Sequence, residues 1–235
     1  MGNQHYFCKL KIKKIKTITS LSYKPISFAK MEILESTMIT DIIKESLNKS
    51  MSYDEYRTLV TSLVEQQSTT GNEKTEALVD YTKMNDRRMK RWDKTVRLSD
   101  DAIEKITAYT KNVTWLVLTE SWCGDAAHIM PVINKVAEQN KNIDYKVVLR
   151  DDNEDLMNQF LTNGGKAIPK LIAIDNETLE VLDTFGPRPS IATEMVNVYK
   201  AQYGKLTPEF KEDLQRWYNK DKGQSTIEDL LYLLD

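Results

Sequence analysis

The stretch that decides the fold of this 235-residue chain reads Leu118-Thr-Glu-Ser-Trp-Cys-Gly-Asp-Ala-Ala-His-Ile-Met-Pro-Val-Ile133. It follows the β-favouring run Val113–Thr119, whose near-continuous apolar character predicts a strand covered on both faces. It continues into a helix predicted from Ala126 to Gln139 by apolar residues on one side. Cys123 therefore lies where a buried strand passes into a helix, which is where open α/β sheets gather ligands.

Strands and helices alternate on the carboxyl side of this stretch. The patterns predict strands over 145–149, 170–174 and 181–185, and helices over 152–162, 191–203, 208–218 and 226–234. On the amino side, three helices are predicted between residues 36 and 91, with a capping box formed by Ser52 and Glu55 and a break at Gly71. Parallel strands separated by helices indicate an α/β protein with right-handed crossovers.

The stretch around Cys123 resembles the active-site segment of thioredoxins, in which a strand leads into Trp-Cys-Gly-Pro-Cys. Pro131 follows Cys123 by eight residues, as a proline does in that family. Ala167-Ile-Pro-Lys-Leu171 resembles the family's Ile-Pro-Thr-Leu segment, whose proline is cis and faces the active cysteine. Gly186 matches a glycine after the last strand. The resemblance covers about 99–203 and implies a thioredoxin-like fold, with a central mixed sheet flanked by helices.

The same resemblance divides the chain into four segments. We expect a basic, flexible segment over 1–30, a helical extension over 31–98, a thioredoxin-like domain over 99–205, and C-terminal helices packed on that domain over 206–235. Residues 1–30 hold seven lysines and no acid, so removing them from a net charge of −2 leaves −9 on the remainder. Segment 1–30 is either a tail for nucleic acid or lipid or an upstream extension outside the folded unit.

Three departures from the family limit what can be carried over. Ala126 replaces the second cysteine, Asp125 replaces the intervening proline, and Val117 stands where the family has a buried acid. The chain therefore has no internal resolving thiol, and Cys8 in the N-terminal segment is a poor substitute. A mixed disulfide on Cys123 must be released by an external thiol.

The resemblance implies that Cys123 is the catalytic residue of a monothiol disulfide oxidoreductase. Its partner would be a protein or a small-thiol disulfide. The expected supporting or substrate-binding residues are Trp122, Gly124, Asp125, Ala126, Ile168 and Pro169. A start-of-helix position favours the thiolate, whereas Glu120 and Asp125 oppose it, so we expect a modestly lowered pKa for Cys123.

Other interpretations of the same residues stay open. The alternative function is a redox-inactive binding module that keeps the thioredoxin groove, and a weaker one is an oxidation sensor forming a sulfenic acid. In the binding module, Cys123 is an inert small hydrophobic residue. His128 is interpreted as a surface histidine, and Asp125 as a complement to the helix dipole or a proton-transfer group. The basic cluster at 87–92 is interpreted as a solvated helix end rather than a nucleic-acid site.

Composition excludes several classes of function. No run of about 18 apolar residues occurs, so no membrane span is expected. Phosphate-binding glycine motifs are missing, and two cysteines with two histidines at unrelated spacings predict neither a metal nor another cofactor. The two cysteines also form no disulfide framework, which is typical of a reducing cytosol. We therefore expect a cytoplasmic protein that binds neither nucleic acid nor membrane.

Overall fold

The computed structural model describes the backbone of residues 28–235 and the side chains of residues 37–235. The expectations for residues 1–27, including Cys8, therefore lie outside the described residues. Helix α1 (Phe28–Asn48) is the first described element. The division of the chain at residues 30, 98 and 205 stays a prediction.

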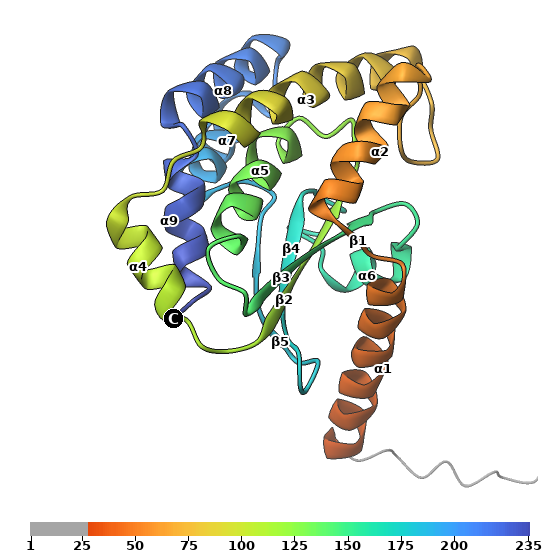
Figure 1. Ribbon diagram of the computed structural model, residues 1–235. Coiled ribbons are helices and arrows are strands. Elements are labelled where there is room, and N and C mark those ends of the chain that lie inside the picture. Colours follow the sequence, from red (N-terminus) through yellow and green to blue (C-terminus); the bar gives the residue numbers. More distant parts are fainter. Residues whose placement is uncertain (1–27) are drawn as a thin grey trace, which may run out of the picture.

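A five-stranded mixed sheet in the order β1-β3-β2-β4-β5 forms the centre of the fold (Figure 1). Its strands are β1 (Met51–Ser52), β2 (Val113–Thr119), β3 (Ile143–Leu149), β4 (Lys170–Asp175) and β5 (Val181–Phe185). Strand β2 is parallel to β3 and antiparallel to β4, and β4 pairs antiparallel with β5. All seven residues of β2 are buried, as the apolar run predicts for a central strand.

Helices precede, connect and follow the strands of this sheet, and they pack around it. They are α2 (Tyr53–Glu65), α3 (Glu76–Thr95), α4 (Asp100–Ala108), α5 (Ala126–Ala137), α6 (Glu154–Gln159), α7 (Ser190–Tyr203), α8 (Pro208–Asp221) and α9 (Gln224–Tyr232). Helix α5 packs against β3 and contacts both α3 and α9. The helix that follows Cys123 is therefore in contact with one helix that precedes it in the sequence and one that follows it. The predicted α/β thioredoxin-like fold is confirmed.

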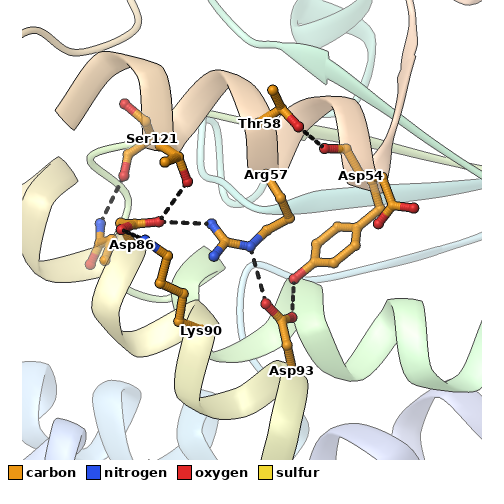
Figure 2. A network of polar contacts seen from close by, with 10 residues as sticks. Asp54, Arg57, Thr58, Asp86, Lys90, Asp93 and Ser121 are labelled. Carbon is orange, nitrogen blue, oxygen red and sulfur yellow. Dashed lines mark hydrogen bonds and ion pairs between the residues drawn. The ribbon is translucent and has the colours of Figure 1, made fainter. Parts of the chain in front are cut away.

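An ion-pair network joins α2 to α3 (Figure 2). Arg57 lies between two carboxylates, with Nη1 3.3 Å from Asp86 and Nε 3.2 Å from Asp93. The hydroxyl of Tyr53 donates to Asp93 at 2.6 Å, and Lys90 Nζ lies 2.7 Å from Asp86. Because Asp86 is buried, removing both Arg57 and Lys90 would leave its charge without compensation. The network therefore holds the two helices as one unit.

Local sequence signals located most elements within a few residues. Ser52 and Glu55 form the predicted capping box of α2, and Ser99 caps α4. The patterns did not predict β1, whose two residues pair antiparallel with β3. A strand this short has no periodicity, and it immediately precedes a strong helix-start signal.

Candidate functional site

The candidate site lies between the carboxyl end of β2 and the first turn of α5. Cys123 is only 7% exposed there. Its thiol donates a hydrogen bond to the carbonyl oxygen of Ile168 at 3.3 Å, and the Ala126 amide donates to Sγ at 3.5 Å. The Ile168–Pro169 peptide bond, which leads into β4, is cis. The structure thus brings together the two segments that sequence analysis singled out.

The thiol of Cys123 is strongly held in its neutral form. Burial, with a smaller contribution from the negative charge of Asp125, raises its pKa to about 12. The amides of Ala126 and Asp125 and the charge of Arg188 act in the opposite direction but do not prevail. The expectation of a modestly lowered pKa is therefore wrong. Loss of water around the thiolate outweighs the favourable helix start.

Asp125 does more than complement the helix dipole. Its carboxylate forms an ion pair with Arg188 Nη2 at 2.6 Å and accepts a hydrogen bond from the Tyr218 hydroxyl at 3.0 Å. It makes no capping hydrogen bond to α5. Burial raises the pKa of Asp125, while Arg188 and Tyr218 lower it. This side chain joins the cysteine loop, residues 120–125 between β2 and α5, to α8 and to the segment between β5 and α7.

Two guanidinium groups flank the residues after Cys123. Arg88 Nη1, from α3, lies 3.8 Å from the point that a Cβ on Gly124 would occupy, and it donates to Asn85 Oδ1 at 3.0 Å. Arg188 binds Asp125 through Nη2, whereas its buried Nε has no partner among residues 37–235. Sequence analysis placed Arg88 in the basic cluster at 87–92, interpreted as a solvated helix end, and did not single out Arg188; the structure leaves Arg88 only partly exposed. Only the fold brings residues so distant in sequence to one loop.

Ser121 is held at every polar atom by residues of the preceding helical segment. Its amide donates to Thr70 Oγ1 at 2.8 Å, and its carbonyl oxygen accepts from Asn85 Nδ2 at 2.9 Å. Its hydroxyl accepts from the Thr70 amide at 3.0 Å and lies 3.1 Å and 2.9 Å from the hydroxyls of Thr69 and Thr82. Sequence analysis missed this cluster, although the Thr69-Thr70 pair beside the predicted helix break was a usable signal. The cluster fixes the backbone two residues before Cys123.

Glu120 and Trp122 are the remaining large side chains of the cysteine loop. Glu120 is fully buried, and its Oε1 accepts from the Asp151 amide at 2.9 Å. Its Oε2 has no hydrogen-bond partner in the described part of the chain, and burial raises its pKa. Trp122 is half-buried, with the guanidinium of Arg150 5.0 Å from its ring centroid. Trp122 therefore packs against Arg150 and also borders the site.

His128 is not the surface histidine that the sequence predicted. It is 2% exposed and stacks on Tyr218 with ring centroids 4.4 Å apart. Trp92 Nε1 donates to Nδ1 at 2.8 Å, so the proton of the neutral ring lies on Nε2, which is 2.7 Å from Gln215 Oε1. Burial lowers the pKa of His128 to about 4. The prediction was wrong because α3 and α8 cover a helix face that local sequence presents as polar.

The described residues were also surveyed for metal sites and membrane spans. Across residues 37–235, no three histidine, cysteine, aspartate or glutamate side chains lie together in a way that could hold a metal ion. None of the described helices is long and apolar enough to cross a bilayer. The basic cluster at 87–92 is partly internal, because Met89 and Trp92 are buried.

Comparisons with known proteins found one family model and two solved structures that are similar to this chain. A family model described as Thioredoxin matches residues 71–203, which is more than half of the chain and includes the cysteine loop and the 168–169 segment. A crystal structure of a protein of unknown function from Pseudomonas aeruginosa superposes with a TM-score of 0.50 at 19% identity, covering 64% of this chain and 83% of that one. An HIV epitope scaffold gives a TM-score of 0.49 at 18% identity, over 78% of this chain and 97% of the scaffold. The search of curated proteins returned no match.

Proposed function

Because this chain belongs to the thioredoxin family, we propose that it is a one-cysteine thiol–disulfide exchange protein that acts through Cys123. The observation that carries the proposal is the position of Sγ between the Ile168 carbonyl oxygen and the first turn of α5. A disulfide laid along the 168–169 segment would place a sulfur atom next to Sγ. The backbone there would hold a partner peptide by strand-like pairing.

The exchange needs no second cysteine in this chain. Sγ of Cys123 attacks one sulfur of a partner disulfide, forming a new S–S bond while the partner's S–S bond breaks. The leaving sulfur takes up the proton lost by Cys123 and departs as a thiol. An external small thiol then attacks the mixed disulfide, so that Cys123 is reduced again and the partner sulfur leaves in a new disulfide.

Burial of the thiol makes this exchange slow in the resting protein. With a pKa of about 12, the thiolate fraction at pH 7 is roughly three-thousandfold smaller than that of a free cysteine with a pKa near 8.5. The greater nucleophilicity of a basic thiolate compensates only in part. We therefore assign the hydrogen bond to Ile168 a protective role in the resting protein. A partner that displaces this bond would release the sulfur for attack.

The high pKa and burial of Cys123 favour a second candidate function. A thiol that never ionises would leave a redox-inactive module that uses the same groove to bind a partner protein. Such a module would keep the Ile168 bond whether or not a disulfide is present. Reactivity of Cys123 separates the two functions.

A mass measurement on the full chain tests the proposal. The Cys8→Ser protein is incubated at pH 8 with bis(2-hydroxyethyl) disulfide, a neutral reagent, and then with excess thiol. We expect one adduct on Cys123 that the thiol removes, and no adduct in the Cys8→Ser/Cys123→Ser control. Failure of the folded protein to form the adduct, when the denatured chain forms it readily, would favour the binding module. A thiol modified by peroxide but by no disulfide would indicate the sensor.

A further inference from the structure

We infer that the partner of Cys123 is a disulfide carrying carboxylate groups, recognised by the guanidinium groups of Arg88 and Arg188. This inference rests on the proposed function and names the substrate class of the same site. It comes from the side chains that enclose residues 124 and 125, immediately after the reactive sulfur. Together these arginines form the arginine pair.

The two members of the arginine pair approach the loop from different parts of the chain. Arg88 comes from α3 and reaches over Gly124. Arg188 comes from the segment between β5 and α7 and reaches Asp125. Guanidinium groups bind carboxylates in a planar, two-pronged geometry, so a pair on two sides of a loop suits an anionic ligand.

Arg88 keeps guanidinium donors that no described residue accepts, whereas Arg188 is largely committed. Arg88 donates to the neutral amide of Asn85 and forms no ion pair with any described carboxylate. Arg188 is paired with Asp125 through Nη2, but its buried Nε has no partner within residues 37–235.

The positive charge here is only partly compensated, because one carboxylate, that of Asp125, acts on both Arg188 and Arg88. Asp125 offsets one guanidinium, and Asp151 is already paired with Arg150. The field of Arg88 reaches the first turn of α5, where the charges of Arg88 and Arg91 help to lower the pKa of His128. Residues 31–235 together carry a charge of −9, so a cationic site on this body is a local feature. A local positive field raises the encounter rate of anions with a nearby group.

The exchange with such a partner forms and breaks the same bonds as the exchange with an uncharged disulfide. Cys123 loses its proton and forms a bond to one sulfur of the carboxylate-bearing disulfide, whose S–S bond breaks. The other half leaves as a carboxylate-bearing thiol that takes the proton. The carboxylates change neither charge nor bonding, so their contribution is to binding and orientation alone.

A series of aliphatic disulfides that differ in charge tests this inference. Rates of adduct formation on Cys123 are measured at pH 8 in the Cys8→Ser protein with 3,3′-dithiodipropionate, bis(2-hydroxyethyl) disulfide and cystamine. Each rate is divided by the rate of the same reagent with the denatured chain. We expect the dianion to exceed the neutral reagent by about tenfold, the dication to be slowest, and the advantage to shrink at high salt.

Two matched variants assign the effect to Arg88. Arg88→Gln removes the charge beside Gly124, and Arg87→Gln removes one charge from an exposed neighbour on the same helix. Most of the preference for the dianion should disappear in Arg88→Gln and remain in Arg87→Gln. Equal normalised rates for the three reagents, or equal losses in the two variants, would overturn the inference while leaving the exchange function intact. Absence of any adduct with the neutral reagent would instead remove the exchange function itself.

Discussion

The thiol of Cys123 donates a hydrogen bond to the carbonyl oxygen of Ile168 across 3.3 Å. This contact links the start of α5 to the segment before β4, which lies 45 residues farther along the chain. It occupies the sulfur in its neutral form, in agreement with a pKa of about 12. The contact and the raised pKa together indicate a neutral thiol in the resting protein.

Neutralising Asp125 should make Cys123 more reactive. Asp125→Asn removes the second-largest cause of the raised pKa of Cys123, after burial, while Arg188 still lowers that pKa. We expect alkylation by iodoacetamide at pH 8 to rise by about tenfold, the equivalent of one pKa unit. Asp213→Asn, an exposed carboxylate on α8, is the matched control and should leave the rate unchanged. A slower reaction in Asp125→Asn would show that we have assigned the charge effect incorrectly.

Ala126→Cys should create dithiol activity. Residues three apart at a helix start lie on one face, so the new sulfur would be within reach of Cys123. Reduction of insulin with a thioredoxin-regenerating system should become measurable, although slow, since Val117 supplies no buried acid. The control is Ala126→Ser, because serine is close in volume to cysteine and has no redox chemistry. This variant should not reduce insulin. Equal activity of the cysteine and serine variants would contradict the expected geometry.

The Ser121 cluster should contribute to stability through Thr70. Thr70→Val removes the oxygen that accepts from the buried Ser121 amide, which leaves that donor without a partner. We expect a loss of about 1–3 kcal/mol in the free energy of unfolding, measured by urea denaturation. Thr58→Val, at an exposed hydroxyl on α2 that donates to the Asp54 carbonyl oxygen, should change stability by less than about 0.5 kcal/mol. Similar losses in both variants would remove the special role of the cluster.

His128 should make the protein less stable in mild acid. Its pKa is about 4 in the folded protein and near 6.5 when unfolded, so the unfolded chain binds more protons between these values. Stability from this group is complete above pH 6.5 and falls as the pH decreases towards 4. The loss by pH 5 should be about 2 kcal/mol and should be missing from the profile of His128→Gln. Parallel pH profiles for the two proteins would show that His128 titrates normally.

Sequence analysis predicted the fold better than the chemistry of the site. The boundaries of β2 and the start of α5 follow from a continuous apolar run next to a polar loop, which are local properties. The burial of His128 depends on helices α3 and α8, which precede and follow α5 in the chain. The pKa of Cys123 depends on burial in a site that includes the distant Ile168. Desolvation by distant segments has no local sequence signal, so both expectations were wrong. Only the folded chain shows Arg88 beside Gly124.

The pH dependence of disulfide exchange at Cys123 tests the account most directly. In the Cys8→Ser protein, the rate of adduct formation with bis(2-hydroxyethyl) disulfide is followed by intact mass from pH 6 to 10, with the denatured chain as reference. We predict a thiol-reversible adduct whose rate in the folded protein rises through pH 10 without levelling off, because the pKa of the thiol is about 12. An adduct rate that levels off below pH 8, or no adduct on folded Cys123 at any pH, would contradict the account.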